Sequence, residues 1–129
     1  MDQSRKGCSC PHCPEQWVTY RESCYFFSQE KKDWNSSQES CWAQGAHLLV
    51  ISNTSEIAGL LPEDAHQISL IGLQNRTGSG WTWEDGSKLS GQKVLSNTLV
   101  QKCAVLLEGA IHASSCEVFA PRICEKSLQ

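Results

Sequence analysis

Eight cysteines in a chain of 129 residues constrain this protein more than any other feature of its sequence. In so small a chain, with several long spacings between them, cysteines are typical of a disulfide framework, which forms outside the reducing cytosol. Eight cysteines allow on the order of a hundred complete pairings, so their spacing alone does not select one. We therefore expect an exported, disulfide-bonded protein.

The length and the charge of the chain limit further which class of protein it can be. The chain suits one domain, and its formal net charge of −3 gives no basic patch for nucleic acid. No apolar run comes near the ~18–20 residues of a membrane span, and no secretory signal is present. We interpret the chain as a fragment whose membrane segment was left behind. Three N-glycosylation sequons agree with export, and they begin at Asn35, Asn53 and Asn75.

The first half of the chain predicts two strands, a helix, a third strand and a second helix. Residues 17–20 and 24–27 form the first two strands, with a tight turn at 21–23. Residues 47–51 form the third strand. The second helix starts with a capping box, in which Asn53 is the cap and Glu56 lies three residues on, and it ends at Pro62.

The first helix is predicted from one apolar face. Asp33 or Asn35 can cap its start, and Gly45 ends it. The residues of its face fall at helical spacing and are Trp34, Ser37, Cys41 and Trp42.

Two tryptophans mark the centre of the predicted core. Residues 70–73 are a short apolar strand, and the glycine at position 72 indicates that another backbone or a large ring lies close. After a polar turn, Trp81 and Trp83 lie two apart, so on an extended chain both rings face the same way and bury together.

The segment 88–100 is long for a connection and is predicted to be a functional or mobile loop. Residues 103–107 and 110–116 then flank Glu108-Gly109, a hairpin signal, and residues 121–124 form a last short strand.

The same tryptophan segment carries a family resemblance. Leu70-Ile71-Gly72-Leu73 is similar to the W-I-G-L pattern of C-type lectin-like domains, and residues 81–87 match their W-x-W-x-D/N-G-S pattern. The natural-killer and myeloid receptor branch resembles this chain most, and residues 30–37 and 113–118 resemble killer-cell lectin-like receptor subfamily G. The chain departs from the family at Leu70, which is usually Trp. It departs again at Arg122, which is usually aromatic and which we expect to face a partner or solvent.

This resemblance implies an α+β, C-type lectin-like fold, in which two helices pack on two small antiparallel sheets. It assigns residues 13–129 to this domain and leaves residues 1–12 as the remnant of a membrane-proximal stalk. It implies three disulfides within the domain: Cys13–Cys24, Cys41–Cys124 and Cys103–Cys116. Cys8 and Cys10 are left in the stalk, where we expect them to link two chains into a homodimer or heterodimer.

No enzymatic activity and no cofactor are expected. Cys10-Pro11-His12-Cys13 has the C-x-x-C spacing of thiol–disulfide oxidoreductases, but Pro14 follows, and no βαβ unit is predicted to carry the motif. With Cys8, the same cluster offers potential zinc ligands that lie too close together in sequence for a good tetrahedral site. The histidines lie in different predicted elements, and no nucleophile stands at a recognisable turn.

Calcium-dependent sugar binding is also not expected. Members of the family that bind sugar carry E-P-N or Q-P-D in the long loop and W-N-D before the last cysteine of the hairpin, because calcium needs roughly six to eight oxygen ligands. Between Gly86 and Cys103 this chain has no Asp, Glu or Pro, and the W-N-D position reads Ile111-His112-Ala113. Trp81 and Trp83 could stack on a sugar without calcium, but we interpret them as core.

The function that remains is recognition of a protein on another cell. The resemblance implies the extracellular domain of a type II receptor in the plasma membrane of lymphocytes or myeloid cells, with a cadherin, an MHC-class-I-like protein or a lectin-like protein as ligand. The alternative is a calcium-independent, dectin-like receptor for glycans. A partner is expected to dock away from the three sequons. The predicted contact residues are therefore Lys88, Lys93, Gln101, Leu106, Glu108, Ile111 and His112.

Overall fold

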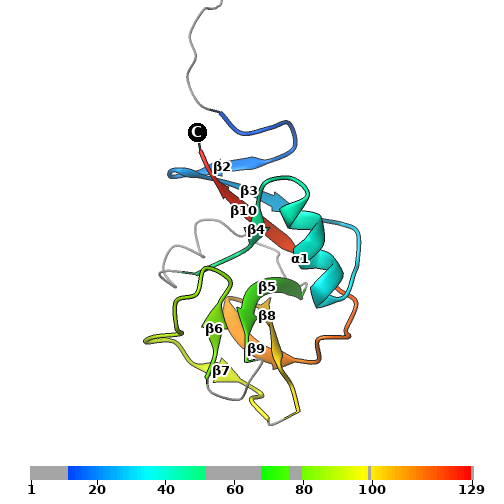
Figure 1. Ribbon diagram of the computed structural model, residues 1–129, viewed down its shortest axis with the longest axis vertical. Coiled ribbons are helices and arrows are strands. Elements are labelled where there is room, and N and C mark those ends of the chain that lie inside the picture. Colours follow the sequence, from blue (N-terminus) through cyan, green and yellow to red (C-terminus); the bar gives the residue numbers. More distant parts are fainter. Residues whose placement is uncertain (1–11, 52–67, 76–79, 99, 129) are drawn as a thin grey trace, which may run out of the picture.

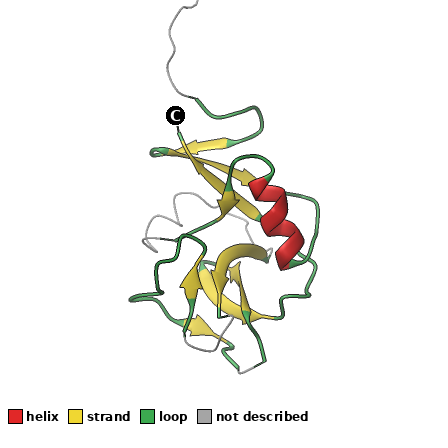
Figure 2. Ribbon diagram, viewed as in Figure 1, coloured by secondary structure: helices red, strands yellow, loops and turns green. Residues whose placement is uncertain are grey.

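The described part of the chain folds into two small sheets with one helix packed beside them, as a computed structural model shows (Figure 1, Figure 2). The structure describes residues 12–51, 68–75, 80–98 and 100–128. The four-stranded sheet, at the top of Figure 1, has the order β2-β3-β10-β4. Its strands are β2 (Val18–Tyr20), β3 (Ser23–Phe27), β10 (Ile123–Ser127) and β4 (His47–Leu48).

The second sheet has five strands in the order β6-β5-β8-β9-β7 and lies at the lower end of Figure 1. Its strands are β6 (Thr82–Trp83), β5 (Ser69–Gln74), β8 (Cys103–Leu107), β9 (Ala110–Ser114) and β7 (Val94–Leu95). The pairs β5·β8 and β8·β9 are antiparallel, whereas β7 runs parallel to β9. The expectation of two wholly antiparallel sheets is therefore wrong at this edge.

The helix α1 (Trp34–Trp42) begins and ends as its sequence predicts. Asp33 Oδ1 accepts a hydrogen bond of 2.9 Å from the Ser36 amide, which fixes Asp33 as the cap and lowers the pKa of its carboxyl. At the other end Gly45 adopts a positive φ of 72°, which lets its own amide and that of Ala46 bond back to the last turn. No helix in the described part of the chain is long and apolar enough to cross a membrane.

Gly72 brings the two sheets together. Its amide donates a hydrogen bond of 2.8 Å to the Leu49 carbonyl, just beyond β4. A Cβ at this position would lie 2.9 Å from the Leu48 carbonyl oxygen. The expectation that another backbone lies close to this glycine is confirmed, and this contact brings β5 of one sheet against the β4 segment of the other.

Two groups of buried side chains form the core. One lies around Trp81 and Trp83, which are both buried as predicted, together with Ile71 and Leu73 of β5. The other lies under α1 and surrounds Trp34, whose indole Nε1 donates a hydrogen bond of 2.9 Å to the Ile71 carbonyl. Strands β5 and β8 each contribute side chains to both groups, so the two parts of the core are continuous with the five-stranded sheet.

The described cysteines form three disulfides, which are the pairs that the family resemblance implies. Cys41–Cys124 joins α1 to β10, and Cys103–Cys116 ties the start of β8 to the segment after β9. Cys13–Cys24 holds the start of the domain onto β3. Cys8 and Cys10 lie outside the described residues.

Several expectations are corrected by the structure. The strand predicted at residues 47–51 is limited to His47–Leu48, although the Leu49 amide still donates to the Ile123 carbonyl. Trp42 is not part of the buried helix face, because 54% of its surface is exposed. The second predicted helix, with Asn53, Glu56 and Pro62, lies outside the described residues.

Arg122 is buried rather than exposed, contrary to the expectation that it faces a partner or solvent. Only 5% of its surface is exposed. Its guanidinium lies over the Phe26 ring, 5.8 Å from the centroid, and its Nη1 is 3.4 Å from the Glu30 carboxylate. An aromatic contact and a partly paired charge let a cation take the position that the family gives to an aromatic side chain.

Candidate recognition surface

The predicted contact residues that remain at the surface lie on or beside different strands of the five-stranded sheet. Lys88 follows β6 and forms an isolated bridge to Thr82, and Lys93 immediately precedes β7. Glu108 lies in the turn of the β8–β9 hairpin, and His112 lies on β9. Lys88, Lys93 and Glu108 are exposed, and His112 is half-buried.

Leu106 and Ile111 do not belong to this surface. They are 2% and 4% exposed and pair with each other across the hairpin, with their side chains in the core. Along β9, Ile111 and Ala113 are buried and His112 is half-buried, which is the period of two that a half-buried strand shows. That alternation is visible in the sequence and would have removed Ile111 from the predicted set.

The parallel pairing of β7 with β9 brings the long loop and the hairpin together. Leu95 lies opposite His112, and Lys93 immediately precedes Val94, which lies opposite Ile111. The loop is tied to the rest of the molecule by Gln92, whose Nε2 donates to the Ile51 carbonyl at 3.4 Å. Gln101 makes a local contact, in which its Oε1 accepts from the Thr98 hydroxyl at 3.3 Å. Lys93 therefore lies next to β7, which pairs with the strand that carries His112, and Gln101 lies further along the same loop segment as Lys93.

Exposed apolar side chains add to this surface, and sequence analysis missed them. Val100 is 82% exposed and precedes Gln101, and Leu95 of β7 is also exposed. Single exposed apolar residues are ordinary on protein surfaces. Here they lie on the segment that also carries Lys88 and Lys93, so the surface combines apolar groups with positive charge.

Asp85, an acidic residue close to the loop, forms hydrogen bonds within its own turn. Asp85 accepts hydrogen bonds from the Ser87 hydroxyl at 2.6 Å and from the Ser87 amide at 2.9 Å, and these bonds lower the pKa of Asp85. They close the turn that follows β6. Within the described residues, no group of three or more His, Cys, Asp or Glu side chains is placed to hold a metal ion.

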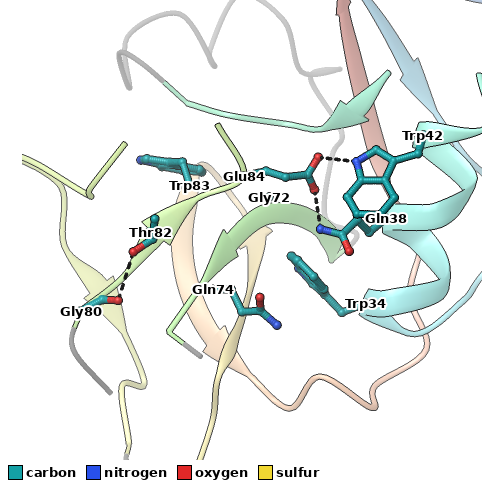
Figure 3. Close-up of a pocket in the computed structure, with 9 residues that line it drawn as sticks. All are labelled: Trp34, Gln38, Trp42, Gly72, Gln74, Gly80, Thr82, Trp83 and Glu84. Atoms are coloured by element: carbon teal, nitrogen blue, oxygen red, sulfur yellow. Dashed lines mark hydrogen bonds between the residues drawn. The ribbon is translucent and has the colours of Figure 1, made fainter. Parts of the chain in front are cut away.

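A hollow that the sequence did not predict lies between α1 and strands β5 and β6. It has a volume of about 330 Å³ and is bounded by the helix residues Trp34, Gln38 and Trp42 on one side and by Gln74 and Glu84 on the other (Figure 3). Glu84 accepts hydrogen bonds from Gln38 Nε2 at 3.2 Å and from Trp42 Nε1 at 3.3 Å.

The sequons differ in their surroundings. Asn35 is exposed on α1. Asn75 follows β5, and its Oδ1 accepts a hydrogen bond of 3.2 Å from the Gly80 amide. Asn53 lies outside the described residues.

The helix, the two small sheets and the three disulfides of the described residues together define a C-type lectin-like domain. The family model of the lectin C-type domain matches residues 30–126, and the chain belongs to this family. It is 46% identical over 118 residues to human killer cell lectin-like receptor subfamily G member 1, covering 92% of this chain and 60% of that protein. The mouse receptor of the same name is 41% identical over 119 residues, covering 92% of this chain and 62% of that protein. The predicted resemblance to this receptor family is confirmed.

Solved structures agree on the fold. The carbohydrate-recognition domain of the mouse scavenger receptor C-type lectin matches with a TM-score of 0.79 at 25% identity, covering 91% of this chain and 98% of that chain. The chain spans about 60% of the length of the two curated receptors named above. The match therefore describes a domain of such a receptor.

Proposed function

We propose that this chain is the extracellular ligand-binding domain of a type II membrane receptor on lymphocytes or myeloid cells, and that it recognises a protein on another cell without calcium. The observation that carries the proposal is the composition of the calcium-binding positions. The loop between Gly86 and Cys103 contains no Asp or Glu, and the hairpin position before Cys116 has the buried side chains of Ile111 and Ala113. A calcium ion would need roughly six to eight oxygen ligands.

The proposed docking surface consists of Lys88, Lys93, Glu108 and His112, with the apolar side chains of Leu95 and Val100. Interfaces of this kind place apolar contacts among charged groups, and a few residues supply most of the binding energy. Among the ligands that the family resemblance implies, we propose a cadherin; an MHC-class-I-like or lectin-like protein is the alternative within the same class.

The experiment is a binding screen of the soluble domain against cadherin, MHC-class-I-like and lectin-like ectodomains, followed by alanine variants. We expect at least one of Lys93→Ala, Val100→Ala and Glu108→Ala to weaken binding by about thirtyfold, which corresponds to roughly 2 kcal/mol. Glu39→Ala, on the exposed side of α1, is the matched control and should bind normally. If Glu39→Ala abolishes binding and the three surface variants do not, the partner docks on α1 instead. The same domain is also screened against glycans. If it binds glycans but none of the protein ectodomains, the alternative of a dectin-like receptor for glycans holds.

We further propose that Cys8 or Cys10 joins two receptor chains. Both precede the domain, so a bridge between two chains would require no distortion of the fold. The full-length receptor on cells should then migrate as a dimer without reductant. The double variant Cys8→Ser with Cys10→Ser should migrate as a monomer; a persistent dimer would show that another contact holds the chains together.

A further inference from the structure

Trp42 is held in one orientation although its ring is largely exposed. Its indole Nε1 donates to Glu84 Oε2 at 3.3 Å. The same carboxylate oxygen accepts from the Leu48 amide at 3.2 Å, and Oε1 accepts from Gln38 Nε2 at 3.2 Å. Glu84 is thereby anchored to the backbone of β4 and fixes the side chains of Trp42 and Gln38. An exposed ring that is fixed in this way is preorganised for contact with a ligand.

The ring borders the hollow between α1 and strands β5 and β6. Figure 3 shows the Glu84 carboxylate pointing toward both Trp42 and Gln38, with Trp34 and Gln74 lower in the view. The volume of about 330 Å³ is at the lower end of the range of roughly 300–1,000 Å³ that small-molecule sites occupy. It therefore suits a ligand of one or two small rings.

The chemical groups of the side chains that line the hollow indicate which class of ligand it can bind. One donor each of Gln38, Gln74 and Thr82 already bonds within the chain. The amide oxygens, the second amide hydrogens and the hydroxyl lone pairs of these neutral side chains are left for a ligand, and Trp42 offers an aromatic face. The described lining contains no Lys, Arg or His, so nothing in it would attract an anion. A pyranose ring, with a face of C–H groups and a rim of hydroxyl groups, matches an aromatic face beside amide groups.

A cationic ligand is the competing class, because indole faces and a carboxylate both attract cations. Glu84 is already occupied, however. Its two oxygens accept three hydrogen bonds out of about four lone-pair positions. The carboxylate serves as a fixed part of the wall and has little capacity left for a further donor.

We infer that this hollow binds a neutral sugar unit, which stacks on Trp42 and forms hydrogen bonds with Gln38, Gln74 and Thr82. The sugar has two possible sources, the chain's own N-glycan or a glycan of another molecule. Asn35, Gln38 and Trp42 fall at i, i+3 and i+7 on α1, so a glycan on the exposed Asn35 would begin beside the hollow. This site shares no residue with the surface proposed for the protein partner, so either proposal can fail without the other.

The test is a titration of the 129-residue chain, produced without N-glycans, with diacetylchitobiose, the disaccharide at the base of N-linked glycans. The readout is the NMR signal of each indole N–H, with the Trp42 signal assigned from Trp42→Phe. The Trp42 signal should shift with added sugar, while that of Trp17, which is not part of the hollow, should stay in place. Trp42→Ala should weaken binding about tenfold or more, and Trp42→Phe, which keeps an aromatic face, should bind within a few-fold of the original.

Phe119→Ala is the matched control, because Phe119 is also an exposed aromatic residue but does not line the hollow. It should bind the sugar as the original chain does. No shift of Trp42 at millimolar sugar would overturn the inference. A shift caused by tetramethylammonium but not by the sugar would overturn it as well, in favour of a cation site.

A second titration assigns the source of the sugar, using protein from cells that add N-glycans. If the glycan of Asn35 fills the hollow, the Trp42 signal is already displaced, and Asn35→Gln returns it to the position of the unglycosylated chain. If a glycan of another molecule is the ligand, the signal is not displaced, and added diacetylchitobiose shifts it in both proteins.

Discussion

At the scale of single residues, Gly72 leaves no room for a side chain. An added Cβ would lie 2.9 Å from the Leu48 carbonyl oxygen and 3.1 Å from that of Leu49, and both are backbone atoms that cannot move aside alone. We expect Gly72→Ala to lower the free energy of unfolding by about 1–3 kcal/mol. Thermal unfolding should show a melting temperature lower by several degrees, whereas Ser90→Ala, at an exposed position, should not change it. An unchanged melt in Gly72→Ala would mean that the two sheets are not in close contact here.

Glu125 gives a residue-scale prediction on pH. Its carboxylate accepts from the Val50 amide at 3.1 Å and from the Tyr25 hydroxyl at 3.3 Å. Burial raises its pKa, and the hydrogen bond from Val50, the charge of nearby His47 and the bond from Tyr25 oppose this only in part. A raised pKa in the folded state means that protonated Glu125 favours folding, and that this contribution is lost as the pH rises through the folded-state pKa.

The original chain loses this contribution as the pH rises, whereas the neutral variant Glu125→Gln does not. The melting temperature of Glu125→Gln minus that of the original chain should therefore increase as the pH rises from about 4 to 7. Thermal melts of both proteins at several pH values in that range measure the difference. A difference that stays constant, or that shrinks toward pH 7, would contradict the assigned direction of the pKa.

At the scale of elements, the β8–β9 hairpin offers two substitutions with opposite expected signs. Glu108 and Gly109 both have positive φ, 52° and 78°, as the central residues of a type I′ turn do. Asn tolerates this backbone better than Glu, so Glu108→Asn should raise the melting temperature slightly. Gly109→Ala should lower the free energy of unfolding by about 1 kcal/mol. Equal effects of the two substitutions in thermal melts would argue against this turn.

The elements also show how far the sequence could predict the structure. The hairpin, both ends of α1 and the burial of Trp81 and Trp83 follow from local rules, and all are found. The pairing of β7 with β9 could not be predicted, because two residues in a polar loop give no periodic signal. Trp42 was misassigned for a similar reason: a nine-residue helix buries only part of its surface, and its partner Glu84 lies 42 residues away.

The candidate site was predicted less completely than the fold. The loop and hairpin were proposed from the resemblance and from the position of the sequons, and they stay a proposal. Ile111 was wrongly included although strand alternation argued against it, and Leu106 was wrongly included on a strand that is buried on both faces. Val100 was missed, because exposure of an apolar residue in a loop leaves no pattern in the sequence.

At the scale of the whole molecule, Cys41–Cys124 should matter most to stability among the three disulfides. It spans 83 residues, against 13 for Cys103–Cys116. Loop-closure entropy gives about 4–5 kcal/mol for the longer loop and roughly 3 kcal/mol for the shorter one. Replacing both cysteines of a pair by Ser should therefore lower the melting temperature more for Cys41 and Cys124. The reverse order would contradict this ranking, and peptide mapping that joins Cys103 to Cys124 would contradict the fold.

Recognition of a protein without calcium is what we propose for this molecule, and binding of the soluble domain to ligand-bearing cells distinguishes it from the alternatives. Binding would be measured by flow cytometry in calcium and in EDTA, on cells treated with a glycosidase, with a protease or with neither. We predict that binding persists in EDTA and after glycosidase treatment, and that it disappears after protease treatment. Binding that is lost in EDTA would contradict calcium independence, and binding that is lost with the glycans but not with the proteins would contradict protein recognition.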